Sequence, residues 1–189
     1  MILTRLAAPA DALVSITQAK AHCRVDGDDD TLLLSELIDT AEDYLDGPSG
    51  ILGRALVDQT WSARLASWPS VFVLPVEPVR SVVITYVDQA GASRTLAGDQ
   101  YRLVQPLDAA PQIQWASGVS LPALAVSDYP IEINMLAGFG SPTEVPPAIQ
   151  RAALMMVEHW FANRGVMADG RQEMPLAASA LLARYRRVL

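Results

Sequence analysis

The chain has 189 residues, 51% hydrophobic and 19% charged, so it can bury the core of one ordinary domain, with or without an insertion. Its formal net charge of −7 argues against a protein that wraps nucleic acid, because tight contact with phosphates needs a basic surface. No apolar run approaches the ~18 residues that span a bilayer, and residues 1–9 lack a signal-peptide profile, so we expect a soluble, intracellular protein without a membrane segment.

The first fifty residues are predicted to be helical. Thr17 is a possible N-cap for a short helix that runs to Arg24. A longer helix is expected after the acidic residues 28–30, because negative side chains stabilise a helix N-terminus, and it stops before Gly47. Its apolar residues recur at helical spacing and comprise Leu34, Leu37, Ile38, Ala41 and Leu45.

Between residues 55 and 140 the apolar spacing changes to the alternation that is typical of strands. Strands are expected around Trp61 and over residues 71–75, 79–87, 101–104, 112–115 and 131–136. Residues 88–93, with the sequence DQAGAS, suit a hairpin connection. The middle of the chain is therefore predicted to be rich in antiparallel strands.

Residues 145–164 predict a strongly amphipathic helix that begins with two prolines, where a missing N–H costs nothing. Its apolar stripe comprises Ile149, Ala152, Ala153, Met156, Val157, Trp160 and Phe161. The stripe needs a partner surface, either the core of its own domain or another molecule in an assembly. A last helix is expected after Pro175, and one of its faces carries Ala178, Leu181, Leu182 and Tyr185.

The order of helices, strands and helices predicts an α+β fold. Neither helical segment is large enough to make a core alone, so the N- and C-terminal helices are expected to pack as one helical layer. This predicts a discontinuous helical domain of residues 1–54 and 141–189, with an antiparallel β-rich insertion at residues 55–140.

No catalytic, cofactor-binding or metal-binding group is predicted. The acidic residues from Asp26 onward depart from a calcium loop, because Thr31 replaces its glycine and Leu37 its glutamate. His22 and Cys23 have no further ligand at metal-site spacing, and the single cysteine, expected to be buried, rules out an internal disulfide. The glycine-rich residues 47–53 lack the lysine of a phosphate-binding loop.

Four segments carry a resemblance to a known family. They are ITQAKAHCRVDGDDD with LLLSELIDTAEDYLDG, then GRALVDQTW, then AGFGSPTEVPPAIQRA, and lastly EHWFANRG. In this order and spacing the sequence resembles the head-to-tail connector (adaptor) family of tailed bacteriophages, in its longer form with a β-rich middle that also occurs in gene transfer agents. Each motif is structural rather than catalytic.

The resemblance implies a virion protein at the head–tail junction, made in the host cytoplasm, that is not an enzyme. It implies a dodecameric ring of copies of this chain below the portal protein, joined on the other side to a tail-side connector or tail-completion protein. Double-stranded DNA would pass through the ring without sequence-specific binding, and an acidic lumen would let it slide.

A portal contact is expected from the basic C-terminal end, formed by Arg184, Tyr185, Arg186 and Arg187, because arginine forms forked contacts with carboxylates across interfaces. Favourable charge at a helix C-terminus explains these arginines equally well. Arg164 and Trp160 match the helix motif of the family. Arg164 is a candidate for the same interface, whereas Trp160 and Phe161 are expected to anchor the helix in the core.

Two other functions stay open. A tail-side or other virion adaptor would have the same order of helices and strands but a different neighbour. A small enzyme would have its pocket in the β-rich insertion, and it would need convergent polar groups that the sequence does not display.

Overall fold

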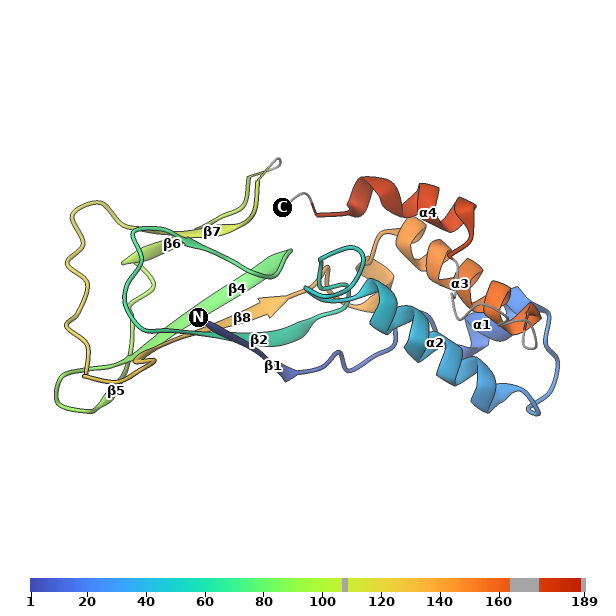
Figure 1. Ribbon diagram of the computed structural model, residues 1–189, viewed down its shortest axis with the longest axis horizontal. Coiled ribbons are helices and arrows are strands. Elements are labelled where there is room, and N and C mark those ends of the chain that lie inside the picture. The colour runs from blue at the N-terminus through green and yellow to red at the C-terminus, as the bar shows by residue number, and fades with distance from the viewer. Residues whose placement is uncertain (107–108, 164–173, 188–189) are drawn as a thin grey trace. The chain divides into compact units, whose positions relative to one another are not determined.

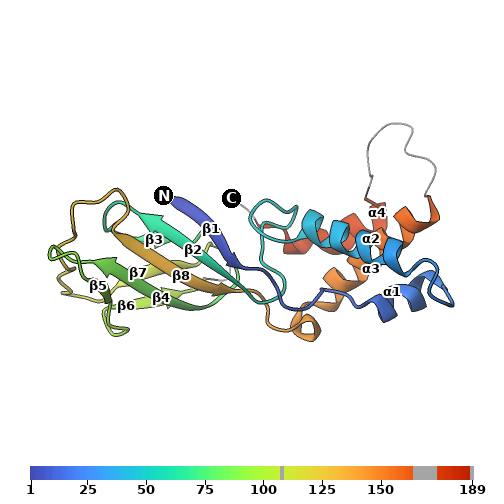
Figure 2. The same ribbon diagram turned by 90° about the horizontal axis from the view of Figure 1, so that it is seen from below.

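The computed structural model describes residues 1–106, 109–163 and 174–187, which form two compact units (Figures 1 and 2). The first, here called the sheet unit, comprises Met1–Pro9 and Asp58–Gly138. The second, here called the helical unit, comprises Ala10–Val57 and Phe139–Arg187. Each unit is therefore built from two separate stretches of the described chain.

The larger sheet of the sheet unit has five strands among the described residues. They are β1 (Ile2–Ala7), β2 (Gln59–Leu65), β8 (Ile131–Ala137), β4 (Val79–Val87) and β5 (Ser93–Thr95), in this spatial order, and every neighbouring pair is antiparallel. A smaller sheet contains β3 (Phe72–Val73), β7 (Gln112–Trp115) and β6 (Tyr101–Val104). The mixed α+β class and the antiparallel strands predicted from the sequence are thus confirmed.

The central strand β8 shows why the larger sheet has one buried face. Its residues alternate, with Ile131, Ile133, Met135 and Ala137 buried and the three residues between them partly exposed. Ile133 lies opposite Ala63 of β2 and Ile84 of β4, both fully buried. Because side chains of directly paired residues share a face, this register builds one continuous apolar surface. The smaller sheet adds Phe72 and Ile113 to the buried set.

The predicted hairpin at residues 88–93 joins β4 to β5. Asp88 accepts hydrogen bonds from the backbone N–H groups of Ala90 and Ala92 at 2.9 Å each, and Gly91 takes a positive φ of 80°. These contacts lower the pKa of the Asp88 carboxyl, chiefly through the Ala92 N–H. Asp88 suits this turn because its carboxylate accepts backbone hydrogen bonds, and Gly91 suits it because glycine adopts a positive φ without steric strain.

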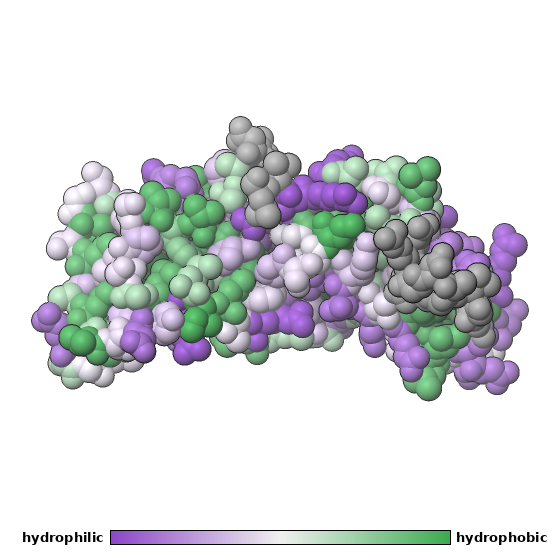
Figure 3. Space-filling view, viewed as in Figure 1, coloured by the Kyte–Doolittle hydropathy of each residue, from purple (hydrophilic) through white to green (hydrophobic). Residues whose placement is uncertain are grey.

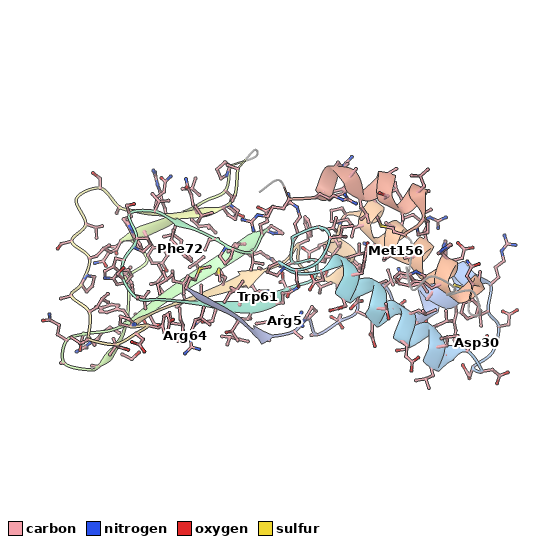
Figure 4. The ribbon with its side chains drawn as sticks, viewed as in Figure 1. Arg5, Asp30, Trp61, Arg64, Phe72 and Met156 are labelled. Atoms are coloured by element: carbon pink, nitrogen blue, oxygen red, sulfur yellow. The ribbon has the colours of Figure 1, made fainter. Side chains whose placement is uncertain are left out.

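The helical unit contains α1 (Ile16–Cys23), α2 (Thr31–Leu45), α3 (Pro147–Ala162) and α4 (Leu176–Leu182), with 3₁₀ turns at Pro142–Glu144 and Ala183–Tyr185. Helix α3 contacts the other three, and Figure 1 shows it between α2 and α4. Its apolar stripe, which includes Met156, faces this core and is buried there (Figure 4). The stripe predicted from the sequence therefore finds its partner surface within the chain.

The N-terminus corrects one prediction. Residues 1–54 were assigned to the helical domain, but Ile2–Ala7 form the edge strand β1 of the larger sheet. The helices are therefore not confined to the ends of the chain, because a strand precedes them. The first helix is capped by Ser15 rather than Thr17, since the Ser15 hydroxyl accepts from the Gln18 N–H and the Gln18 side chain accepts from the Ser15 N–H.

In the part of the chain that the structure describes, no helix is both long and apolar enough to cross a membrane. Figure 3 shows hydrophobic residues interspersed with polar ones on the visible surface.

The buried end of α3 generates a first prediction. Trp160 is 5% exposed in the helical core, so Trp160→Ala should remove most of its packing and lower the free energy of unfolding by about 3–5 kcal/mol. The measurement is thermal unfolding followed by circular dichroism. Leu176→Ala is the control, because Leu176 is 87% exposed and its loss should be nearly neutral. Equal melting of the two variants would contradict the packing role.

Glu42 of α2 generates a second prediction. Its carboxylate accepts a hydrogen bond from the Leu13 N–H, which fixes the segment that leads into α1. Burial raises the pKa of this carboxyl above its ordinary value of 4.5, and the nearby Asp39 and Asp46 add to the rise, although the N–H groups of Leu13 and Val14 oppose it. The folded state therefore holds this proton more tightly than the unfolded state, so its stabilising effect is lost as the pH rises through the raised pKa.

Glu42→Gln keeps an oxygen that can accept the Leu13 N–H but cannot ionise. The free energy of unfolding of this variant minus that of the wild type should therefore increase as the pH rises from about 4 to 7. Urea unfolding at a series of pH values measures the difference. Asp43→Asn, on the exposed side of the same helix, is the control and should show no such increase. A constant difference for Glu42→Gln across this range would refute the assignment.

Candidate functional site

The basic C-terminal segment, residues 183–187, follows α4 directly and belongs to the helical unit. Arg184 and Arg186 are exposed, whereas Tyr185 and Arg187 are partly buried. The guanidinium of Arg184 lies over the ring of Tyr185, with 4.7 Å between Cζ and the ring centroid, a cation–π contact. Neither Arg184 nor Arg186 forms an ion pair with another residue in the described ranges. Two guanidinium groups therefore remain available to a partner.

A turn far away in the sequence holds this segment in place. Arg54 Nε donates a hydrogen bond to the Tyr185 carbonyl at 2.7 Å, and the Arg187 N–H donates to the Leu52 carbonyl at 2.9 Å. A Cβ atom at Gly53 would lie 3.2 Å from Cβ of Arg187, so the backbone of this turn packs tightly against the segment. The arginines are thus presented from a backbone that is hydrogen-bonded on both sides of Arg186.

The turn itself follows α2 and depends on its glycines. The Gly47 N–H donates to the Arg54 carbonyl at 2.7 Å, and the Gly53 N–H donates to the Gly50 carbonyl at 2.9 Å. Asp46 accepts from the Leu56 N–H at 2.7 Å, which ties the end of α2 to the chain beyond the turn. A Cβ at Gly50 would lie 2.3 Å from the Asp46 carbonyl oxygen, so no larger residue fits there without moving backbone.

The other predicted site residues fall in different places. Arg164 lies outside the described residues. Trp160 is buried in the core of the helical unit, and Phe161 is partly buried against the same core. The structure therefore does not bring these two aromatic residues to the surface on which Arg184 and Arg186 are exposed.

The outer face of α2 is acidic. Glu36, Asp39 and Asp43 are exposed and follow one another at helical spacing, so they form one stripe. No ion pair joins them to another residue in the described part of the chain. The helical unit thus presents an uncompensated acidic stripe as well as a basic segment.

His22 and Cys23, at the end of α1, have structural rather than reactive surroundings. His22 Nε2 lies 3.1 Å from a Glu158 carboxylate oxygen, outside good hydrogen-bond alignment, and His22 Nδ1 lies 3.2 Å from Arg151 Nη1. Cys23 is partly rather than fully buried, and burial raises the pKa of its thiol, with a further rise from Glu158. A raised pKa makes a thiol less nucleophilic at neutral pH. The described residues contain no group of three or more side chains placed to hold a metal ion.

A shallow hollow of about 400 Å³ lies on the helical unit, between the segment before α1 and the start of α3. Its side-chain amides already serve the fold, because Gln18 accepts from the Ser15 N–H and Gln150 donates to the Pro142 and Val145 carbonyls.

One surface was missed by the sequence analysis. Strand β1 lies at the edge of the larger sheet, with β2 as its neighbour on one side. Its residues were predicted to be helical, so no edge was expected at this end of the sheet. The signal that could have found it is a short run with β-branched residues, Ile2 and Thr4, closed by Pro9.

The chain is similar over its full length to solved chains from gene transfer agent particles. It matches a chain in a structure of the neck of an empty particle, computed with C6 symmetry, at 26% identity and a TM-score of 0.78. It matches chains in the virion of a native gene transfer agent particle (27%, 0.73) and in the neck of a native particle, computed with C12 symmetry (26%, 0.71). Each match covers 100% of this chain and 98% of the other.

No protein-family model and no curated protein matches the sequence. The similarity therefore rests on the solved structures, and both the sheet unit and the helical unit take part in it, because the matches cover the whole chain.

The turn after α2 generates a third prediction. Gly50→Ala should destabilise the helical unit and release the C-terminal segment, because a Cβ would collide with the Asp46 carbonyl. Limited proteolysis should then cut after Arg184 or Arg186 faster than in the wild type. Gly91→Ala is the matched control, since nothing lies within 4 Å of its Cβ position and its positive φ imposes only local strain in the sheet unit. Equal cleavage rates for Gly50→Ala and wild type would show that the turn does not hold the segment.

Proposed function

We propose that this chain is a structural component of the neck of a gene transfer agent or phage particle, where it forms a ring below the portal and joins the DNA-filled head to the tail. The full-length similarity to neck chains carries this proposal, because it includes both units in one chain and leaves almost none of either protein unmatched. The function is assembly rather than catalysis.

The proposed ring is a dodecamer. The similar chains come from neck structures that were computed with C6 and with C12 symmetry, which supports a closed ring of identical subunits. In such a ring each copy uses two different side surfaces toward its neighbours, and its two ends meet other proteins. The portal protein would lie at one end and a tail-side connector or tail-completion protein at the other.

Double-stranded DNA would pass through the ring without being bound. The net charge of −7 and the uncompensated stripe of Glu36, Asp39 and Asp43 favour this role, because acidic surfaces repel phosphate and so do not hold a moving duplex. No basic groove is needed for DNA that only passes.

The basic C-terminal segment is the proposed portal contact. Arg184 and Arg186 are exposed on a backbone that Arg54 and Leu52 hold in place, so little freedom is lost when they bind. Guanidinium groups form forked hydrogen bonds with carboxylates, so an acidic surface on the portal is the expected partner. Arg164 is a further candidate for this contact.

The test is co-sedimentation of the purified chain with isolated portal rings. Binding to the portal supports the proposed position. A folded chain that does not bind the portal but binds tail-side proteins would instead establish a tail-side adaptor.

Replacing both Arg184 and Arg186 by alanine should weaken portal binding by at least about tenfold, since each charged hydrogen bond contributes about 1.5–3 kcal/mol. Substitution tests the contact more specifically than deletion of the segment does. Deletion would also remove the contacts of Tyr185 and Arg187 that hold the fold. The control is the double variant Arg64→Ala with Arg102→Ala, which removes the same charge from exposed positions of the sheet unit. Equal binding by both double variants would overturn the assignment of this segment.

A further inference from the structure

Strand β1 leaves an open edge on the larger sheet. It pairs with β2 through Ile2 to Ala7, and no other strand of the sheets that the structure describes pairs with it (Figure 2). In a strand, alternate N–H and C=O groups point to each side, so half of these groups in β1 face outward. Such an edge is a template for pairing with another strand.

The side chains of β1 do little to discourage pairing. Ile2 is 37% exposed and Leu6 is 55% exposed, and the strand contains a single charged residue, Arg5. The guanidinium of Arg5 lies over the ring of Trp61 on the adjacent strand, with 5.8 Å between Cζ and the ring centroid (Figure 4). Monomeric proteins usually protect an edge of this length with lysine, proline or a covering loop.

At the opposite edge of the larger sheet, β5 pairs with only part of β4, and side chains bond to backbone groups in the rest of β4. The Tyr101 hydroxyl donates to the Val82 carbonyl at 3.0 Å, and the Gln105 side chain accepts from the Val79 N–H at 3.3 Å. These side chains satisfy backbone groups of β4 that would otherwise be free. Beyond them the edge is β5 alone, which has three residues, all exposed. One edge of the larger sheet thus ends in the short strand β5, whereas the other ends in β1, which pairs only with β2 in the described sheets.

We propose that β1 pairs with β5 of a second copy of this chain, so that the larger sheets of neighbouring copies join edge to edge around the ring. This inference rests on the proposed ring. A cyclic ring repeats one contact between two different surfaces of the subunit, and the two edges of one sheet are such a pair.

The direction of the strands fits this contact. Five strands in consistently antiparallel order place β1 and β5 in the same direction, so copies related by a small rotation pair in parallel.

The first experiment traps the pairing with cysteines. Ile2 shares a sheet face with Thr95, since both lie in the row that runs through Arg64, Glu132 and Thr85. Two double variants are made in a Cys23→Ser background. One carries Ile2→Cys with Thr95→Cys, and the other carries Thr4→Cys with Thr95→Cys, which tests a register shifted by two residues. Each is oxidised both in free solution and on portal rings. At least one should give a ladder of covalent oligomers. The control Leu3→Cys with Thr95→Cys should give none, because Leu3 faces the opposite side of the sheet.

The second experiment needs no assumption about register. Hydrogen exchange of the full chain is compared between the free state and the assembled ring, whose size is checked by native mass measurement. Amides of both β1 and β5 should exchange at least about tenfold more slowly in the ring. A ring without this protection and without the ladder would overturn the pairing but leave the proposed function standing. Protection of β1 without β5 would assign the edge to another protein and also overturn it. A chain that forms no oligomer, even on portal rings, would overturn both proposals.

Discussion

The burial of α3 is the interaction on which the rest of the structure depends. This helix contacts α1, α2 and α4, and its apolar stripe, from Ile149 to Trp160, has no exposure above 5%. Its partners α1 and α2 come before Asp58–Gly138, the long segment of the sheet unit, so the core of the helical unit closes only when the chain returns from about eighty residues of strands. The chain crosses between the two units after Pro9, after Val57 and after Gly138.

The packing of the helical core also fixes the position of the candidate interface, the basic C-terminal segment. The turn after α2 and the segment after α4 are 131 residues apart at their Arg54 to Tyr185 contact, and they meet because α2 and α4 both pack on α3. The backbone that carries the exposed arginines is consequently fixed by hydrogen bonds to the helical unit and is not a free tail. Their neighbours Tyr185 and Arg187 serve the fold, whereas Arg184 and Arg186 are exposed and form the proposed contact with a partner. A surface that keeps its shape before contact loses less freedom on binding.

Much of the fold and of the candidate interface could be predicted from the sequence, and the features that were not predicted were missed for physical reasons. The strands at 79–87 and 131–136 and the helix at 145–164 were evident because burial on one face imposes a regular period. Strand β1 was not, since Ile2, Leu3, Leu6 and Ala7 also fit a helical stripe, and its conformation is decided by pairing with β2, almost sixty residues away. The arginines of the C-terminal segment were visible as a basic run. That Leu52 and Arg54 hold them was not, because hydrogen bonds to backbone carbonyls leave no mark on the sequence.

We propose that this chain is a ring subunit of a particle neck and that the ring contains one copy of the chain for each portal subunit. The most direct test is the mass of portal rings saturated with the chain, measured by native mass spectrometry. The account predicts saturation at one chain per portal subunit, with twelve chains on a twelvefold portal. Saturation at a lower ratio, or a mixture of unrelated ratios from a folded chain, would contradict it.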